Sequence, residues 1–317
     1  MFVIQCKNNI FFAFYLRKLT EFCDAIKKLM ENKNLRFVYL IVLALIWGSS
    51  FILIKRGLVA LTPYQLGSLR MVFAAVFLLI IGFNSIKNIE LRHWKYLALT
   101  AVFGTFIPVF LFSIAQTQIS SSVSAILNSL TPLNTLVLGI LLFKIDFQRR
   151  QIFGVFIGLM GSALLIFNGA ANHPEQNYNY AVLLVIASVC YAMNVNFIKM
   201  YLSDLNPLSI TTGNFIIMLI PASLVLYFSG FFEAVQVKET QNVIGYIAVL
   251  GIVGTALANI LFYKLIKISS PVFASSVTYL IPVVAFMWGL VDNESLTLVQ
   301  FIGAAIILVG VYLSARK

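Results

Sequence analysis

Charged residues are scarce in this sequence, and acidic residues are the scarcer kind. Only 10% of the 317 residues are charged, with 11 Asp and Glu against 22 Lys and Arg. An ordinary soluble domain is about 25% charged and about 45–50% apolar, whereas this chain is 61% apolar with a mean hydropathy of +0.96. Because a water-soluble globule cannot cover so much apolar surface, the composition excludes a soluble enzyme, a disordered chain and a nucleic-acid-binding module. It indicates a polytopic membrane protein.

Cysteine and histidine are also rare. The three cysteines, Cys6, Cys23 and Cys190, are odd in number and lack metal-ligand spacing, so no disulfide framework and no metal site is predicted. The two histidines, His93 and His173, are expected in loops, and no Asp or Glu lies within a long apolar run. Membrane proton relays usually depend on such groups. We therefore expect no cofactor and no carboxylate-based proton coupling.

Long stretches without charge are abundant. They cover residues 37–54, 71–86, 96–143, 151–172, 176–198, 205–232, 240–263, 268–291 and 295–315. A membrane-spanning helix needs about 20 mostly apolar residues. The 48-residue stretch is long enough for two spans around a Gln-Thr-Gln and Ser-rich turn, and the second stretch extends back to Tyr64. The sequence therefore predicts an all-α integral membrane protein with ten transmembrane helices, because lipid-exposed continuous apolar runs satisfy their backbone only as helices.

The basic residues predict the orientation of these spans. If the N-terminus is cytoplasmic, 18 of the 22 Lys and Arg fall in cytoplasmic segments, three fall outside and Arg70 lies within a span. Acidic residues divide almost evenly between the two sides. This asymmetry follows the positive-inside rule, so both termini are expected in the cytoplasm of a multi-pass protein of the plasma membrane. The rule also explains the net positive charge, so this charge does not indicate a nucleic-acid partner.

Residues 1–35 stand apart as a predicted cytoplasmic N-terminal extension. Ile10–Leu16 is apolar but too short to span, and the segment lacks the cleavage site of a signal peptide. Two interpretations remain open here. Lys27, Lys28 and Lys33 could contact anionic lipid, or the segment is an upstream extension of a protein whose core begins near Met30.

The chain contains an internal repeat. At an offset of 144 residues Trp47 matches Tyr191, and Ser50 matches Asn194. The same offset of 144 residues also pairs Lys55 with Lys199 and Pro63 with Pro207. In the later parts of the chain the offset is 149 or 150 residues. The pairs there are Gly104-Thr105 with Gly254-Thr255, Ser120 with Ser270, Pro132 with Pro282, Gln151 with Gln300, Gly154 with Gly303 and Gly161 with Gly310.

Duplication predicts two repeats of five helices each, at residues 36–168 and 180–315. Because five is odd, the second repeat enters the membrane from the opposite side, and the two are inverted. This architecture is typical of alternating-access transporters, whose site lies at the repeat interface near the midplane. We therefore expect a central cavity between the halves.

The chain resembles the EamA family of the drug/metabolite transporter superfamily over residues 37–315. The matching residues are Trp47-Gly48-Ser49-Ser50-Phe51, Lys55, Pro63, Arg70, Thr131-Pro132-Leu133, Gly254-Thr255-Ala256, Pro282, Glu294 and Gln300-Phe301-Ile302-Gly303. The resemblance implies ten helices and the export or exchange of amino acids and other small metabolites. The first half departs from it, with Ile145-Asp146 where the family often has the Glu that Glu294 supplies in the second.

The basic residues at the spans each allow two interpretations. Arg70 lies about six residues into the second span, roughly 9 Å deep at 1.5 Å per residue. It either faces the bundle interior to pair with a ligand anion, or snorkels to the headgroups or fixes two helices. Lys55 and Lys199 are either interfacial anchors or paired cationic entrances to the passage.

Other candidate residues lie well inside the spans. Trp47 shares a helix face with Ser50, as Tyr191 does with Asn194, so these residues either line a cavity or pack helices. Pro132 and Pro282 interrupt matched spans and are the predicted hinges. The polar residues near them either contact the ligand or bond between helices: Asn128, Asn134, Asn259, Tyr263, Thr278 and Tyr279. Gly154, Gly158, Gly161, Gly303 and Gly310 are predicted to permit close helix packing.

These features predict a secondary transporter for small metabolites such as amino acids, an exporter or exchanger that works by alternating access. Its partners would be the lipid bilayer and a zwitterionic or anionic small molecule. The substrate-binding residues would be Trp47, Ser50, Lys55, Arg70, Asn128, Tyr191, Asn194, Asn259, Tyr263 and Tyr279. The alternative is an integral-membrane enzyme or a channel, although the spans lack a nucleophile with a base.

Overall fold

The computed structural model describes residues 35–170, 177–291 and 298–315. Most of the predicted N-terminal extension, together with His173, Asp292 and Glu294, lies outside the described residues. The chain divides into two units, residues 1–39 and 40–317. Of the first unit, the structure describes only the start of helix α2, and every later helix belongs to the second unit.

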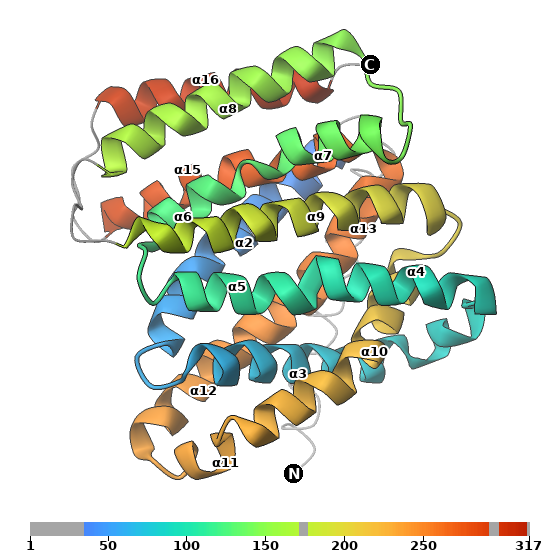
Figure 1. Ribbon diagram of the computed structural model, residues 1–317, viewed down its shortest axis with the longest axis vertical. Coiled ribbons are helices and arrows are strands. Elements are labelled where there is room, and N and C mark those ends of the chain that lie inside the picture. The colour runs from blue at the N-terminus through green and yellow to red at the C-terminus, as the bar shows by residue number, and fades with distance from the viewer. Residues whose placement is uncertain (1–34, 171–176, 292–297, 316–317) are drawn as a thin grey trace, which may run out of the picture. The chain divides into compact units, whose positions relative to one another are not determined.

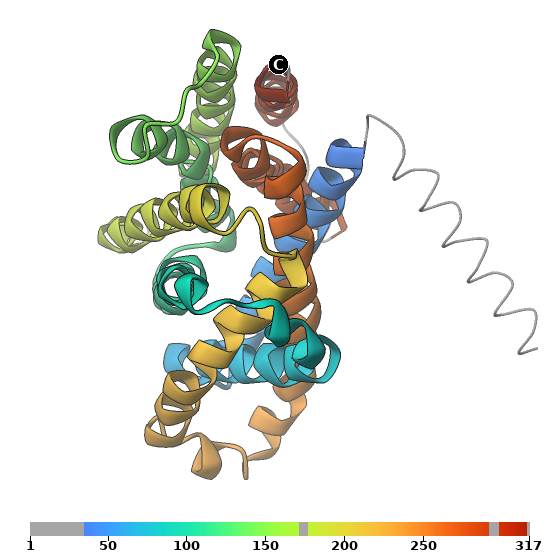
Figure 2. The same cartoon turned by 90° about the vertical axis from the view of Figure 1, so that its right-hand side faces the viewer.

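Every regular element in the described ranges is a helix (Figure 1). In chain order these are α2 (Leu35–Gly57), α3 (Pro63–Gly82), η1 (Phe83–Asn88), α4 (Leu91–Ala101), η2 (Val102–Phe106), α5 (Ile107–Ala115), α6 (Ser121–Asn128), α7 (Thr131–Leu141), α8 (Arg149–Ala170), η3 (Tyr178–Tyr180), α9 (Ala181–Tyr201), α10 (Pro207–Phe228), α11 (Phe231–Ala234), α12 (Lys238–Gly251), η4 (Ile252–Leu257), α13 (Ala258–Ile268), α14 (Pro271–Ser275), α15 (Val277–Val291) and α16 (Leu298–Ala315). The elements η1 and η3 are 3₁₀ helices, and η2 and η4 are π-helical segments. Figure 2 shows several of the long helices almost end-on.

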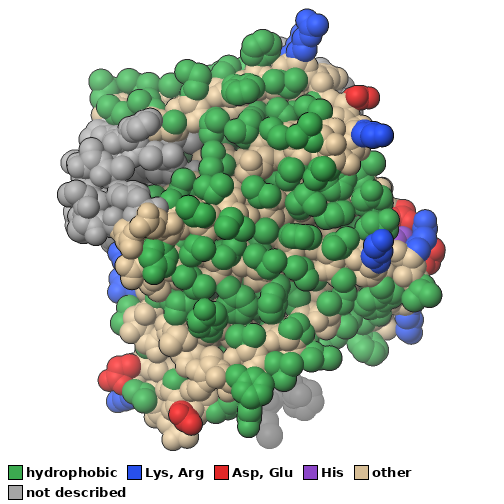
Figure 3. Space-filling view, viewed as in Figure 1, with side chains coloured by type: hydrophobic (Ala, Val, Ile, Leu, Met, Phe, Trp, Pro, Cys, Tyr) green, Lys and Arg blue, Asp and Glu red, His purple; other side chains and the backbone are tan. Residues whose placement is uncertain are grey.

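Six helical stretches of the described residues are long and apolar enough to cross a membrane. They are Leu35–Gly57, Pro63–Asn88, Leu91–Ala115, Ala181–Tyr201, Pro207–Phe228 and Lys238–Ile268, and shorter apolar helices occur at Thr131–Leu141, Pro271–Val284 and Ala305–Ser314. Apolar side chains cover most of the face seen in Figure 3, whereas charged ones gather at its margins. Exposed Ile80, Phe153 and Tyr227 are examples of this apolar surface. The prediction of an all-helical, multi-pass membrane protein is confirmed.

Two matched helices begin with the same local chemistry. Thr62 caps α3 by accepting a hydrogen bond from the Gln65 amide, and the Gln65 side chain accepts one from the Thr62 amide in return. Asn206 caps α10 by accepting from the Leu208 amide. A proline follows each cap, where its missing N–H costs nothing because that position has no intrahelical partner. Sequence alone therefore determines where both helices start.

The two predicted proline interruptions differ in detail. The first break lies between α6 and α7, directly before Pro132 in the first turn of α7. The second lies at Ser276 between α14 and α15, whereas Pro282 is inside α15. Pro282 therefore does not mark the break in its own stretch. The role of both prolines as hinges stays a prediction.

Helices α8 and α16 approach each other through glycines (Figure 1). A Cβ placed on Gly310 would lie 2.5 Å from the backbone nitrogen of Gly158, and one on Gly154 would lie 2.7 Å from the carbonyl oxygen of Gly310. Since backbone atoms cannot rotate away, these positions admit only glycine at this spacing. The predicted close packing is present at these residues.

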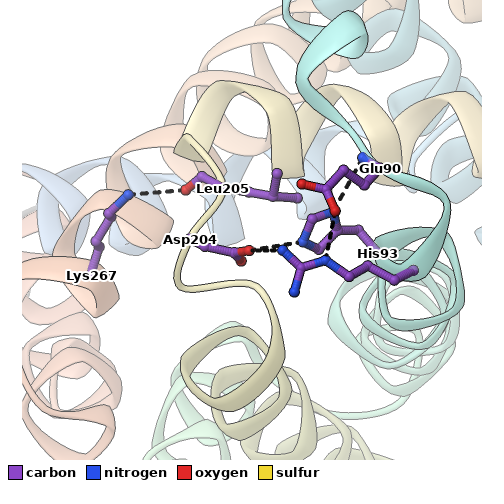
Figure 4. A network of polar contacts seen from close by, with 6 residues as sticks. Glu90, His93, Asp204, Leu205 and Lys267 are labelled. Carbon is purple, nitrogen blue, oxygen red and sulfur yellow. Dashed lines mark hydrogen bonds and ion pairs between the residues drawn. The ribbon is translucent and has the colours of Figure 1, made fainter.

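A polar network ties the start of α4 to the connection between α9 and α10 (Figure 4). The Nδ1 atom of His93 accepts a hydrogen bond from the Glu90 amide, and its Nε2 lies 3.0 Å from the Asp204 carboxylate. Arg92 donates to both Glu90 and Asp204, at 2.8 and 2.9 Å. Contrary to the sequence prediction, His93 is not in a loop but lies buried in the first turn of α4.

Candidate functional site

A cavity of about 840 Å³, any open solvent included, lies among helices from both halves of the sequence. Its walls come from α2, α3, α5, α6, α7, α9, α13, α14, α15 and the π-helical segments η2 and η4. The lining residues are Trp47, Ser50, Phe51, Ile54, Arg70, Gly104, Thr105, Val109, Phe112, Asn128, Thr131, Tyr191, Asn194, Val195, Gly254, Thr255, Asn259, Phe262, Ser275, Thr278 and Ile281.

Arg70 is the only charged residue in this lining. Its Nε donates a hydrogen bond to Thr255 Oγ1 at 2.5 Å, and Thr255 in turn donates to the carbonyl oxygen of Leu250 at 2.9 Å. None of the ion pairs formed by the described residues involves Arg70. The cavity therefore presents a cation without a carboxylate to neutralise it.

Aromatic rings form a large part of the wall. Trp47 meets Phe262 edge to face, with 5.0 Å between ring centroids. Phe112 contacts Phe51 and Tyr191, each at 6.0 Å between centroids. Such contacts hold large side chains in fixed positions, so the cavity has firm apolar walls around its few polar groups.

The π-helical segment η4 brings its backbone to the cavity beside α2. The indole Nε1 of Trp47 donates to the carbonyl oxygen of Gly254 at 3.1 Å. A Cβ on Gly254 would lie 2.8 Å from Ser50 Oγ, which itself donates to the Ile46 carbonyl oxygen at 2.8 Å. π-helical turns often occur at functional sites, and this one lets the chain approach α2 closely.

The segment η2 makes the matching approach to α9. A Cβ on Gly104 would lie 2.6 Å from the side-chain Cγ of Asn194. Asn194 Oδ1 and Thr105 Oγ1 are buried, and neither has a hydrogen-bond partner among the described residues. Gly104 and Gly254 thus allow the same close approach between the two halves of the sequence. Ser50, beside Gly254, is hydrogen-bonded, whereas the polar atoms beside Gly104 have no hydrogen-bond partner among the described residues.

The residues that the repeat offsets pair in sequence lie together around the cavity. At an offset of 144 the lining pairs are Trp47 with Tyr191, Ser50 with Asn194 and Phe51 with Val195, and at 150 they are Gly104 with Gly254, Thr105 with Thr255, Val109 with Asn259, Phe112 with Phe262, Asn128 with Thr278 and Thr131 with Ile281. Arg70, Ile54 and Ser275 line the cavity without their counterparts. Each half of the sequence therefore supplies equivalent positions to one site.

Seven of the ten predicted site residues line this cavity, namely Trp47, Ser50, Arg70, Asn128, Tyr191, Asn194 and Asn259. Lys55 is exposed at the end of α2. Tyr263 is buried with its hydroxyl hydrogen-bonded to Asn214 (3.2 Å), and the buried Tyr279 hydroxyl donates to the Val155 carbonyl oxygen (2.9 Å). Neither tyrosine is among the lining residues, so both serve as bonds between helices here.

Sequence reasoning did not assign Thr105 and Thr255 to the site, although the repeated Gly-Thr pair had drawn attention to them. It also missed the rings of Phe51, Phe112 and Phe262, although Phe51 follows Ser50 in the first span and the offset of 150 pairs Phe112 with Phe262. No group of His, Cys, Asp or Glu among the described residues is placed to hold a metal ion.

Comparison with known proteins gives consistent matches along the chain. The sequence model described as the EamA-like transporter family matches residues 35–167 and 179–316. An uncharacterized transporter of Archaeoglobus fulgidus is 28% identical over 87% of this chain and 98% of its own. The uncharacterized inner membrane transporter YedA of Escherichia coli is 26% identical over 87% of this chain and 89% of its own.

A third relative, named a probable amino-acid metabolite efflux pump of Salmonella typhimurium, is 24% identical over 86% of this chain and 92% of its own. A solved crystal structure shares the fold with a TM-score of 0.68 at 14% identity, covering 89% of this chain and 96% of that one.

Proposed function

Because this chain belongs to the EamA-like transporter family, we propose that it is a secondary transporter that moves small polar metabolites across the cell membrane. It works by alternating access, as an exporter or an exchanger. The observation that carries this proposal is the cavity, which both halves of the sequence line with equivalent residues around one unpaired cation. The family and the names of the relatives indicate a transporter rather than an enzyme.

The proposed architecture is ten transmembrane helices in two inverted repeats, residues 36–168 and 180–315. The family model matches twice, once in each of these segments. The paired lining residues, the matched caps of α3 and α10 and the paired π-helical segments support the duplication. In this arrangement α8 and α16 are the fifth helix of each repeat, packed against each other.

The proposed substrate carries a carboxylate. A half-buried cation without a protein counter-ion favours an anionic ligand group, and Arg70 holds this position in the cavity. The rings of Trp47, Tyr191 and Phe262 would cover the apolar part of the molecule. Amino acids and related metabolites fit both requirements, and a relative named as a probable amino-acid metabolite efflux pump agrees with this assignment.

We propose that transport needs no proton. No Asp, Glu or His belongs to the described lining of the cavity, and membrane proton relays usually depend on these residues. The helix breaks before Pro132 and at Ser276 lie beside the lining residues Asn128, Thr131, Ser275 and Thr278. Rocking of helix groups about these breaks would expose the cavity to each side in turn.

The test is purified protein in liposomes, loaded with one unlabelled metabolite at a time and measured for counterflow of the labelled compound. We expect at least one amino acid or related carboxylate to accumulate transiently, as carrier-mediated exchange requires. Liposomes without protein and liposomes with Arg70→Ala are the controls. A broad panel in which no solute exchanges faster than in protein-free liposomes would contradict the proposed function.

A further inference from the structure

Thr105 and Asn194 leave two buried oxygen atoms without partners in the wall of the cavity. Both side chains are only 3% exposed. Other unpartnered buried atoms occur in the described chain, for example in Asn196 and Thr212, but only those of Thr105 and Asn194 belong to lining residues. Buried polar atoms in folded proteins are normally hydrogen-bonded, so this pair is suited to a ligand.

The positions that the repeat pairs with these two are satisfied by the protein itself. Ser50, the counterpart of Asn194, donates to the Ile46 carbonyl oxygen. Thr255, the counterpart of Thr105, donates to Leu250 and accepts from Arg70. The lack of partners is therefore specific to Thr105 and Asn194 and is not shared by their counterparts Thr255 and Ser50.

Asn194 is held in place rather than free to turn away. Gly104 lies against its amide, where a Cβ would approach Cγ to 2.6 Å. The oxygen acceptor of Asn194 thus has a defined position, with Tyr191 one helical turn before it on α9 and also in the cavity wall.

We propose that Thr105 Oγ1 and Asn194 Oδ1 form an acceptor site for a protonated amino group, carried by the same solute whose carboxylate binds Arg70. This inference rests on the proposed function and names the residues that would decide its specificity. An ammonium group donates three hydrogen bonds, and Tyr191, another lining residue, has an aromatic ring of the kind that binds cations. Solutes that lack the amino group leave both oxygen atoms unsatisfied and bind less well.

The test compares ligands that differ only in the amino group. Dissociation constants are obtained from thermal unfolding of the full chain in detergent, with L-phenylalanine beside 3-phenylpropanoate and L-leucine beside 4-methylpentanoate. We expect the better-binding amino acid to bind at least about tenfold more tightly than its analogue, or ~1.4 kcal/mol. In Asn194→Leu and in Thr105→Val the ratio should fall close to one.

The matched control is Asn196→Leu, which removes an equally buried asparagine with an unpartnered Oδ1 from the same helix but outside the cavity lining. It should keep the wild-type ratio even where it lowers the unfolding temperature. Equal binding of the two members of a pair by the wild type would overturn this inference alone. Binding of neither member of either pair would overturn it together with the carboxylate assignment of the cavity.

A second and independent observation concerns two lysines that the repeat pairs, Lys55 and Lys199. The Nζ of Lys199 donates to the carbonyl oxygens of Ile266 and Ser269, at 3.2 and 2.8 Å, and so joins the end of α9 to the end of α13. Lys267 reinforces this end by donating to the Leu205 carbonyl oxygen at 3.2 Å (Figure 4). Basic groups at the last carbonyls of a helix are also favoured by its dipole.

Lys55 makes no such contact. It is exposed, and among the described residues it forms no hydrogen bond or ion pair. Its equivalent acceptors would be the carbonyl oxygens of Gln116 and Ile119, at the end of α5. Helices α2 and α5 meet near there through the rings of Phe51 and Phe112, with 6.0 Å between their centroids.

The lining of the cavity also differs between residues that the repeat pairs near the two lysines. Ile54 belongs to its lining, whereas the counterpart Ile198 is buried and does not. Helices α2 and α9 end at opposite sides of the view in Figure 1. The two lysines therefore belong to opposite ends of the passage, one engaged and one released.

We infer that Lys55 and Lys199 act as alternating clamps, each of which closes its own end of the passage by binding the carbonyl oxygens at the end of the facing helix. The structure is the state in which the Lys199 end is closed. In the other state Lys199 is released and Lys55 binds the end of α5. This inference also rests on the proposed transport cycle.

The test uses spin-label pairs in a background where Cys6, Cys23 and Cys190 are serine. One pair, Ser203 with Ile268, reports the Lys199 end, and the other, Val59 with Gln118, reports the Lys55 end; all four side chains are exposed. Lys199→Met should lengthen the first distance and shorten the second, with a change of about tenfold in the ratio of the two states. Lys55→Met should act in the opposite direction.

The control is Lys87→Met, which removes an exposed lysine of η1 and should leave both distance distributions unchanged. Shifts of the same sign in Lys55→Met and Lys199→Met would overturn the inference, and so would unchanged distances in both. Counterflow of a labelled metabolite in the spin-labelled wild type shows separately that the transport cycle itself is intact.

Discussion

Arg70 and Thr255 are 185 positions apart in the sequence and are joined by a hydrogen bond of 2.5 Å from Nε to Oγ1. The bond fixes the guanidinium of α3 against the π-helical segment η4. A guanidinium has five N–H donors, and among the described residues only this one is used in a hydrogen bond. Arg70 also belongs to the lining of the cavity, whose described residues include no carboxylate.

Replacing Arg70 by Ala should strongly reduce transport while the protein still inserts into the membrane. A hydrogen bond to a charged group is worth about 1.5–3 kcal/mol, so we expect counterflow to fall by about ten- to a hundredfold. Arg70→Lys should recover only part of the loss, because an ammonium cannot keep the Thr255 bond and bind a carboxylate in a bidentate manner. The control is Arg56→Ala, an exposed arginine at the end of α2. Full activity of Arg70→Ala would remove Arg70 from the site.

Gly310→Ala should destabilise the contact between α8 and α16. The new Cβ would lie 2.5 Å from the backbone nitrogen of Gly158, and overpacking of this kind costs about 1–3 kcal/mol. The apparent unfolding temperature in detergent should fall. Gly245→Ala in α12 is the matched control, because nothing lies within 4 Å of a Cβ there and alanine favours a helix. Equal effects of the two substitutions would show that the close approach is absent.

The Asp204 carboxylate should make stability depend on pH in the acid range. Partial desolvation acts to raise its pKa, but the hydrogen bond with His93 and the charge of Arg92 outweigh it, so the pKa lies below its usual value. A lowered pKa stabilises the fold above the ordinary value of about 3.9, and this stabilisation is lost as the pH falls through the lowered pKa. The difference in unfolding temperature between wild type and Asp204→Asn should therefore shrink below pH 4. A difference in unfolding temperature that grows toward acid pH would contradict the lowered pKa of Asp204.

Both termini should lie in the cytoplasm. Fusions of a reporter that is active only in the cytoplasm should give signal after residues near 146, near 204 and at the C-terminus, and none near 173 or 235. The physical reason is the retention of Lys and Arg on the cytoplasmic side during insertion. A cytoplasmic signal near 173 would break the proposed inverted arrangement, because the second repeat would then enter from the same side as the first.

Transport should not require a proton gradient. Since the described lining of the cavity lacks Asp, Glu and His, counterflow at equal internal and external pH should proceed at the same rate when an ionophore abolishes any gradient. Measurement of luminal pH with a trapped dye during uptake is the check. Stoichiometric acidification or alkalinisation of the lumen by the transported solute would disprove uncoupled exchange.

Prediction from sequence succeeded where a signal is local. Thr62-Pro63 and Asn206-Pro207 define helix starts because the cap and the proline act within one turn. Long apolar runs specify membrane helices because the bilayer acts on each segment by its own composition. Trp47, Ser50, Tyr191 and Asn194 could be proposed for the cavity because the repeat pairs them. Tyr263 and Tyr279 have the same chemistry, but they are turned toward Asn214 and Val155.

The sequence by itself determined that this is a helical, multi-pass membrane protein of the EamA-like family, since composition, hydropathy and repeated motifs are properties of the chain alone. Only the tertiary structure decided which polar atoms are satisfied, that Arg70 meets Thr255 and that Lys199 but not Lys55 binds a helix end. Those outcomes depend on which face of each helix meets a partner more than 60 residues away, and packing between distant segments sets that geometry.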